Sequence, residues 1–278
     1  MTDLFICPVC GYPLLHEENR LVCTNTSSKK THSFDLSAAG YVNLAPPSKP
    51  SGDNKAMVKA RSEFLSAGYY EPVADALCDA VRDYASPEPV ILDAGCGEGY
   101  YTNKLSAISK ITVGIDLSKE AITAGAKAAK RENIRNRVSY AVAGIFEMPL
   151  KSESFDVIVS LFAPIDEDEF SRVLRDNGIL ICVCAGPKHL MGLKNFLYSE
   201  TYENTSRADL PRGFELIKKR HIEYTMEVKS NEHVYDLFTM TPYFYRTPKE
   251  ASERLKALDK LQTPVEVDIF IYRKNPRK

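Results

Sequence analysis

The chain has 278 residues, of which 44% are hydrophobic and 26% are charged, and its formal net charge at pH 7 is −1. This length can hold one ordinary α/β domain with a smaller companion, and the composition is that of a soluble globular protein. No apolar run approaches the ~20 residues that a membrane span needs, and the balanced charge gives no argument for nucleic-acid binding. The first residues lack the layout of a signal peptide, so we expect a cytoplasmic location.

The first 44 residues differ in composition from the rest and predict a small separate unit. They are rich in cysteine, glycine and polar residues, with short strand-like pieces at 20–22 and 41–44. The stretch 45–54, APPSKPSGDN, reads as a linker or an exposed loop because proline and glycine interrupt regular structure. The expected divisions are a ribbon over 1–44, a linker and helix over 45–70, and a larger α/β domain over 71–278.

An alternation of helices and strands follows, and it predicts an α/β fold. Asp53 is expected to cap a helix over 54–67, and a second helix is expected over 72–84. Beyond Val90, apolar runs alternate with amphipathic helices, which implies a parallel sheet covered on both faces. The expected strands are 90–95, 111–116, 138–144, 155–162, 178–185, 214–228 and 264–273, and the helices between them are 102–109, 118–133 and 167–176.

A glycine-rich loop at 93–99, DAGCGEG, stands where the first of these strands ends and a helix begins. Its glycines permit positive φ, and the following helix N-terminus offers free N–H groups to a ligand. A dinucleotide loop would carry a further glycine where Tyr100 stands, and here an acid, Asp93, leads the motif. The pattern resembles motif I of class I S-adenosylmethionine (SAM)-dependent methyltransferases. Asp116 ends the next strand, where a carboxylate can accept both ribose hydroxyls.

Three of the seven cysteines fall within the first 23 residues and predict a zinc site. Cys7 and Cys10 have the C-x-x-C spacing of a zinc knuckle, and Cys23 suits the second knuckle of a ribbon. The fourth ligand is either His32 or His16, and we favour His32 because a looped-out insert still delivers it beside Cys23. A segment this short lacks a core of its own and needs a metal to hold it. Four-ligand sites are structural, so we expect this zinc to shape a surface.

The combination of this ribbon with this loop resembles one family in particular, the bacterial 23S ribosomal RNA guanine-N1 methyltransferases. The likeness covers nearly the whole chain, although the gap between the third cysteine and His32 is longer than is usual in the family. The motifs that carry it are CPVCGYPL, HSFD, GYVNL, ARSEFLSAGYYEP, LDAGCGEGYYT, FAP, GPKHL and MTPYFYR. The resemblance implies a class I (Rossmann-like) methyltransferase fold, in which a mixed seven-stranded sheet ends in an antiparallel hairpin, with a small N-terminal zinc ribbon.

The resemblance also implies the functional residues. Carried over by motif, the SAM contacts are Tyr70, Asp93, Gly95, Gly97, Glu98, Asp116 and His189. His189 has a physical rationale as well, since it follows an expected strand at the carboxyl edge of the sheet, where ligands bind. Methyl transfer from SAM mainly requires alignment of the acceptor nitrogen and exclusion of water. Guanine N1 carries a proton that must leave, so a general base or a strongly polarised O6 is expected, and the candidate bases are Glu98, His189 and Asp166.

The implied substrate is a hairpin of 23S ribosomal RNA near the peptide exit tunnel, and one branch of the family confers resistance to macrolides such as tylosin. The target guanine must come from a loop or be flipped out of a stem. The aromatic side chains that could stack on it are Phe162, Tyr243, Phe244 and Tyr245. The candidate phosphate contacts are Lys29 with Lys30, Lys49 with Lys59 and Arg61, the run 218–220, and Arg273 with Lys274, Arg277 and Lys278. Homodimers are common in the family.

Two other functions stay open at this point. A small-molecule methyltransferase could use the same cofactor fold, but it would leave the zinc module unexplained. A non-catalytic zinc-ribbon protein could bind RNA and retain SAM as a structural ligand, but the intact Asp93, Gly97 and Asp116 argue against it. The sequence therefore predicts a cytoplasmic, SAM-dependent rRNA methyltransferase that holds zinc and inserts into no membrane.

Overall fold

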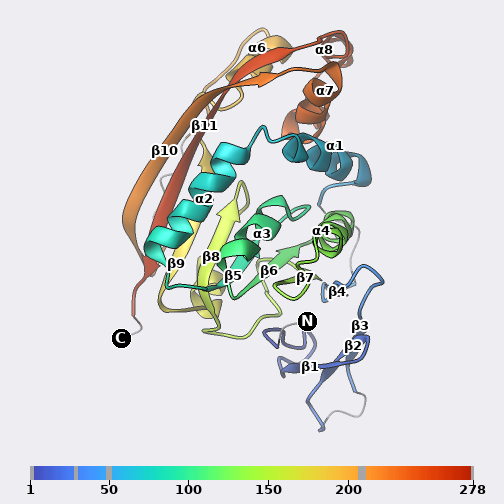
Figure 1. The fold of residues 1–278 in the computed structure, drawn as a ribbon, viewed down its shortest axis with the longest axis vertical. Coiled ribbons are helices and arrows are strands. Elements are labelled where there is room, and N and C mark those ends of the chain that lie inside the picture. The colour runs from blue at the N-terminus through green and yellow to red at the C-terminus, as the bar shows by residue number, and fades with distance from the viewer. Residues whose placement is uncertain (1–2, 28–30, 48–51, 206–210, 277–278) are drawn as a thin grey trace.

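One central sheet organises the chain (Figure 1), which we describe from a computed structural model covering residues 3–27, 31–47, 52–205 and 211–276. Within these residues the sheet has eight strands in the order β10-β11-β9-β8-β5-β6-β7-β4. β11 runs antiparallel to β9 and β10, and the other neighbours are parallel. The strands are β4 (Val42–Asn43), β5 (Val90–Ala94), β6 (Ile111–Asp116), β7 (Val138–Val142), β8 (Phe155–Leu161), β9 (Leu174–Ala185), β10 (Phe214–Val228) and β11 (Leu261–Lys274).

The seven predicted strands are all present, and the mixed α/β sheet is confirmed. β4 is an additional edge strand that comes from the segment expected to belong to the ribbon, and its Val42 pairs in parallel with Ala141 of β7. The last two strands do not form a tight hairpin. Between β10 and β11 the chain forms α7 (Asn231–Thr239), the 3-10 helix η2 (Pro242–Tyr245) and α8 (Lys249–Leu255).

The predicted helices are also present, with two corrections. α1 (Lys55–Ser66) is capped by Asn54, not by Asp53, because the Oδ1 of Asn54 accepts the N–H groups of Ala56 and Met57 at 2.9 and 3.1 Å. The helix expected over 167–176 is shorter, since the chain enters β9 directly after α5 (Glu167–Val173). The remaining helices are α2 (Glu71–Tyr84), α3 (Tyr100–Leu105), η1 (Ser106–Ile108), α4 (Lys119–Arg131) and α6 (Met191–Leu197). In the described part of the chain, none of the helices combines the length and apolarity of a membrane span.

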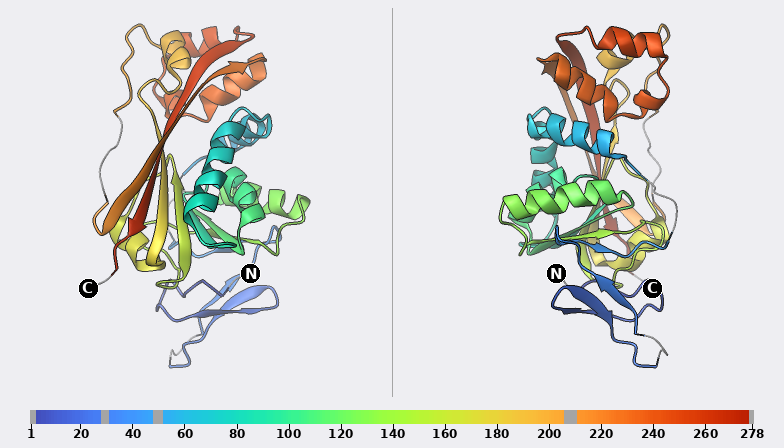
Figure 2. Two further views of the ribbon diagram at one scale, coloured as in Figure 1. Left: turned by 60° about the vertical axis from the view of Figure 1, so that its left-hand side comes forward. Right: turned by 90° about the vertical axis from the view of Figure 1, so that its right-hand side faces the viewer.

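The two faces of the sheet are covered by different kinds of structure (Figures 1 and 2). Helices α2, α3 and α4 pack on one face. The other face is covered partly by α5 and partly by the N-terminal ribbon, whose Phe5, Leu14 and Leu21 pack in one core with Leu92 and Ile158 of the sheet. The ribbon itself is a three-stranded antiparallel sheet of β1 (Leu14–Glu17), β2 (Arg20–Cys23) and β3 (Ser33–Asp35). The ribbon thus shares a hydrophobic core with the larger part of the chain.

Candidate cofactor and metal sites

The loop after β5 has the backbone that its glycines predict. Gly95, Gly97 and Gly99 have φ angles of +81°, +55° and +84°, in the left-handed region that other residues rarely adopt. A Cβ on Gly95 would lie 2.8 Å from the Cβ of Ala163, so this close path requires glycine. A Cβ on Gly97 would meet nothing closer than Nη1 of Arg61 at 3.5 Å. The backbone of Gly97 therefore has room beside it for a ligand.

The glycine-rich loop at 93–99 carries two buried carboxyl groups. Asp93, at the end of β5, is 1% exposed, and its Oδ2 accepts the hydroxyl of Thr102 at 2.6 Å. Glu98 is 8% exposed. Burial raises the pKa of both carboxyls to about 7, because a low-dielectric surrounding disfavours the charged form. A positively charged ligand bound beside them would favour their ionised forms.

Asp116 joins the end of β6 to the same loop. Its Oδ2 accepts the N–H of Gly97 at 3.0 Å, and its Oδ1 accepts the N–H of Ser118 at 2.7 Å. The following residue, Leu117, is 40% exposed, and its Cδ2 lies 3.5 Å from the position of a Cβ on Gly144. The sequence analysis did not include this exposed apolar side chain. A leucine directly after the acid that ends a strand could have been predicted as part of the site. Leu117 provides an apolar wall beside the carboxylate.

Tyr70 and His189, two further predicted cofactor contacts, form a buried hydrogen-bonded pair. The Oη of Tyr70 and Nε2 of His189 are 3.1 Å apart, and the backbone N–H of Glu266 donates to Nδ1 at 3.3 Å. Since Nδ1 is the acceptor, the proton of the neutral ring is on Nε2, which donates to Tyr70. Burial lowers the pKa of His189 to about 4, so the ring is neutral at pH 7.

The Tyr70→Phe substitution is expected to lower the free energy of unfolding by about 1–3 kcal/mol, because it leaves the buried Nε2–H of His189 without an acceptor. Urea denaturation measures this loss. The loss should be the same at pH 6 and pH 8, since His189 stays neutral above a pKa of about 4. The matched control is Tyr202→Phe, which removes a hydroxyl from a side chain that is 76% exposed. Equal effects of the two substitutions would contradict the prediction.

Asp166 and the aromatic candidates occupy distinct positions. Asp166 is the N-cap of α5 and accepts the N–H of Glu169 at 2.9 Å. Phe162 lies beside His189, with 5.6 Å between ring centroids, and is 48% exposed at a positive φ of +52°. The other three aromatic candidates lie together on η2, where Tyr245 is 65% exposed. Phe162 is therefore the exposed ring that the structure places beside a predicted cofactor contact.

The predicted metal ligands converge at one end of the ribbon. The side-chain donor atoms of Cys7, Cys10, Cys23 and His32 all lie within 4.8 Å of one another. The N–H of Cys23 donates to the carbonyl oxygen of His32 at 2.9 Å, so the strand pairing itself brings His32 beside Cys23. His16, the alternative ligand, lies on β1 with an exposed side chain outside this group.

The spacing of these atoms fits a tetrahedral zinc ion. Sγ of Cys10 is 3.4 Å from Sγ of Cys23 and 3.5 Å from Nδ1 of His32. Nδ1 of His32 is also 3.5 Å from Sγ of Cys7. Zinc bonds of about 2.3 Å to sulfur and 2.1 Å to nitrogen place tetrahedral ligand atoms roughly 3.6–3.8 Å apart. The four side chains therefore require only small shifts to close around the ion.

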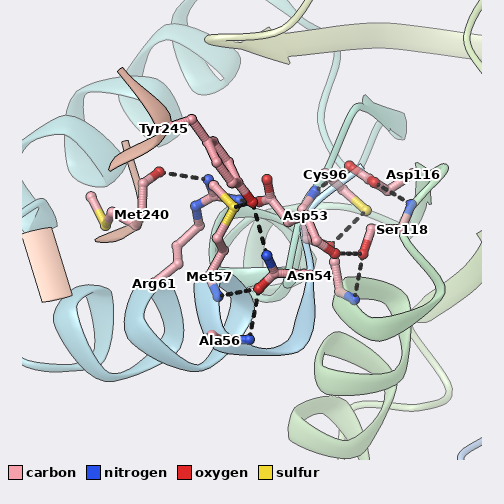
Figure 3. A network of polar contacts seen from close by, with 12 residues as sticks. Asp53, Asn54, Ala56, Met57, Arg61, Cys96, Asp116, Ser118, Met240 and Tyr245 are labelled. Atoms are coloured by element: carbon pink, nitrogen blue, oxygen red, sulfur yellow. Dashed lines mark hydrogen bonds and ion pairs between the residues drawn. The ribbon is translucent and has the colours of Figure 1, made fainter. Parts of the chain in front are cut away.

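A polar network that the sequence did not reveal lies beside the cofactor loop (Figure 3). Arg61 of α1 forms an ion pair with Asp53 and donates from Nη2 to the carbonyl oxygen of Met240 at 3.0 Å. The hydroxyl of Ser118 donates to the carbonyl oxygen of Asp53 at 2.7 Å. Nδ2 of Asn54 donates to Oη of Tyr245 at 2.8 Å. The network thus joins the start of α1 to the end of β6 and to the segment around η2.

Several of the predicted phosphate contacts are paired or buried within the protein. Lys219 and Arg220 form ion pairs with Asp268 and Asp83, and Lys274 is buried, with 1% exposure. Burial removes Lys274 from the candidate phosphate contacts, whereas Lys218 and Arg273 are exposed and remain candidates. The predicted Lys29, Lys30, Lys49, Arg277 and Lys278 lie outside the described residues.

A basic run that we did not predict covers the end of α4 and the turn into β7. Its exposed cations are Lys127, Lys130, Arg131, Arg135 and Arg137. In the described part of the chain, the one ion pair recorded for this group joins Arg131 to Glu132 at 3.8 Å. The density of lysine and arginine in the stretch 127–137 was the sequence signal that could have predicted this basic surface. This run is therefore an exposed basic surface in addition to the predicted clusters.

Two protein-family models match separate parts of the chain. Residues 92–182 match a methyltransferase domain, and residues 5–51 match the N-terminal zinc ribbon of RlmA. Among solved structures, the YcgJ protein from Bacillus subtilis is similar, with a TM-score of 0.51 at 14% sequence identity, covering 73% of this chain and 98% of that chain. These matches confirm the predicted class I SAM-dependent methyltransferase fold and the zinc ribbon.

Relatives of nearly the same length share both parts. The "Putative 23S rRNA (guanine-N(1)-)-methyltransferase YxjB" of Bacillus subtilis (strain 168) is 30% identical over 283 residues, which are 97% of this chain and 96% of YxjB. The 23S rRNA (guanine(748)-N(1))-methyltransferase of Streptomyces fradiae is 28% identical over 264 residues, covering 91% of this chain and 90% of that protein. The chain therefore belongs to the family of 23S rRNA guanine-N1 methyltransferases.

Proposed function

We propose that the chain methylates N1 of a guanine in 23S ribosomal RNA. The observation that carries this proposal is that relatives named for this activity align over more than nine-tenths of the chain, ribbon included. The proposed target is a hairpin near the peptide exit tunnel, where a methyl group would also change the binding of macrolides such as tylosin. We propose that the protein acts in the cytoplasm, where this RNA is found.

The proposed cofactor contacts surround the loop after β5. SAM supplies an activated methyl group, so the residues of the chain bind it, orient the acceptor and exclude water. The proposed role of the Asp116 carboxylate, at the end of β6, is to accept the ribose hydroxyls. Asp93 and Glu98 offer negative charge that suits the amine and the sulfonium. The full set that we propose is Tyr70, Asp93, Gly95, Gly97, Glu98, Asp116 and His189.

Of the three candidate bases for the N1 proton of guanine, Glu98 fits best. A base needs a free lone pair and a pKa near the working pH. His189 has its proton on Nε2, and its Nδ1 already accepts the N–H of Glu266, while Asp166 caps a helix. Burial raises the pKa of Glu98 to about 7, which suits a group that takes up a proton at neutral pH. The exposed ring of Phe162 is the proposed stacking surface for the guanine.

The ribbon is the proposed guide for the RNA. We propose Cys7, Cys10, Cys23 and His32 as the zinc ligands, on the geometry given above. The exposed cations of the run 127–137 can contact phosphates, which supply much of the affinity of proteins for nucleic acids. The ribbon turn lies close to this run, because a Cβ on Gly40 would lie 2.8 Å from Nη2 of Arg135. The two surfaces are therefore adjacent.

Transfer of labelled methyl from SAM to protein-free 23S rRNA, or to precursor ribosomal particles, tests the proposed function directly. We expect incorporation into RNA and a stop in primer extension at one guanine, because N1 methylation prevents Watson–Crick pairing. Cells that lack the protein should lose that stop and regain it on complementation.

The two alternative functions give different results in the same assay. Label in extracted small metabolites, with none in RNA, would identify a small-molecule methyltransferase. Binding of both SAM and RNA without transfer would identify a non-catalytic binding protein. Either result would overturn the proposal.

A further inference from the structure

Arg61 brings a positive charge to the cofactor loop from outside the methyltransferase sheet. It lies on α1, its side chain is 25% exposed, and its Nη1 is 3.5 Å from the position that a Cβ on Gly97 would occupy. Figure 3 shows the guanidinium between Met240 and Asp53, with Asp116 and Ser118 beyond Asp53. Contacts with Asp53 and with the carbonyl oxygen of Met240 therefore hold the guanidinium of Arg61 beside the loop backbone.

The surroundings of Arg61 are otherwise acidic. Asp93, Glu98 and Asp116 all lie at this loop, and Asp53 lies beside Arg61 itself. The charge of Arg61 favours the ionised forms of both Glu98 and Asp116 and lowers their pKa, against the effect of burial. Such a set of acids suits the amine, the sulfonium and the ribose hydroxyls of SAM. It repels the remaining charged group of SAM, which is the carboxylate of its methionine part.

The guanidinium has donors left for that carboxylate. Arginine carries five N–H donors in a planar fork. The contact to Asp53 uses one N–H of Nη1, and the contact to the carbonyl oxygen of Met240 uses one N–H of Nη2. The remaining N–H donors can form the bidentate, charge-assisted hydrogen bonds that arginine makes with carboxylates.

We propose that Arg61 binds the carboxylate of the methionine part of SAM, and that Asp53 and the carbonyl group of Met240 hold its guanidinium in place. The inference rests on SAM as the cofactor of the proposed function and adds a contact from α1. Asp53 is itself fixed, because its carbonyl oxygen accepts the hydroxyl of Ser118 at 2.7 Å. Recognition of the carboxylate is thereby coupled to the turn that follows Asp116.

The test compares two ligands that differ only in this carboxylate. Calorimetric titration of the purified full chain with SAM and with decarboxylated SAM, without RNA, gives both affinities. We expect the wild-type chain to bind SAM about 10- to 100-fold more tightly than the decarboxylated ligand, as for one charge-assisted pair. The Arg61→Met variant should bind SAM weakly and the decarboxylated ligand as before, so that the preference disappears.

Two further variants separate recognition from folding. Lys59→Met removes the same charge from the same helix at a site that is 73% exposed, and it should keep the full preference. Arg61→Lys should keep a reduced preference, because the charge remains without the planar fork. A wild-type chain that binds both ligands equally would overturn the inference, as would an Arg61→Met variant that weakens both equally. These results are independent of whether RNA is the methyl acceptor.

Discussion

Replacing Asp116 with asparagine is expected to lower the affinity for SAM by about 100-fold or more, because charged hydrogen bonds contribute about 1.5–3 kcal/mol each. Both carboxylate oxygens accept backbone N–H groups, from Gly97 and from Ser118. An asparagine amide has one acceptor and one donor end, so one of these N–H groups would face another donor. The substitution therefore disturbs the glycine loop as well as the proposed ribose contact. Calorimetric titration with SAM measures the loss.

The matched control for Asp116 is Asp79→Asn. Asp79 lies on the surface of α2, where its side chain is 60% exposed and pairs with Arg82 at 2.8 Å. Its replacement removes the same charge without touching the loop, and SAM affinity should stay within about twofold of wild type. If the Asp116 variant bound SAM as tightly as this control, Asp116 would have no part in the site.

His32→Ala is expected to abolish stoichiometric zinc and to lower the melting temperature by roughly 10 °C or more, because structural zinc supplies folding free energy. The ribbon core shares Phe5, Leu14 and Leu21 with the main sheet. Collapse of the ribbon would therefore expose apolar surface of the sheet as well. Metal analysis and thermal unfolding, with and without a chelator, measure the two effects.

The chain offers its own control for this experiment in His16. His16 is the other histidine of the ribbon, and it lies outside the cluster of Cys7, Cys10, Cys23 and His32. His16→Ala should retain one zinc ion per chain and the melting temperature of the wild type. Loss of zinc from the His16 variant, with retention in the His32 variant, would reverse the assignment of the fourth ligand.

Local patterns made part of this structure predictable. The φ angles of the glycine loop and the contact of Asp116 with the N–H of Ser118 are short-range features, because they depend on residues within one turn of the chain. The contact of Asp116 with the N–H of Gly97 spans 19 positions, and it forms because the carboxyl ends of adjacent parallel strands meet at one edge of the sheet. The C-x-x-C knuckle is equally local. Apolar runs located most of the seven main strands because these strands are buried on both faces, whereas most residues of β10 are exposed or only partly buried.

The features that the sequence did not reveal depend on distant contacts. Asn54 and Asp53 are both good caps, and Asp53 is drawn away by Arg61, eight positions further on. The tautomer of His189 depends on Tyr70 and on a backbone group of β11, which lie 119 and 77 positions away. The pairing of Val42 with β7 likewise joins residues that no local pattern relates.

The shared core of the ribbon and the sheet has a consequence for zinc supply. β4 adds an edge strand to the sheet, and Phe5 packs against the face of the sheet. The N-terminal ribbon therefore cannot be exchanged between enzymes as an independent domain. In a cell starved of zinc, newly made copies would lack the ribbon that covers part of one sheet face, while the residues of the loop after β5 would be unchanged. Metal scarcity would then silence the enzyme by removing the protein, and not by slowing its chemistry.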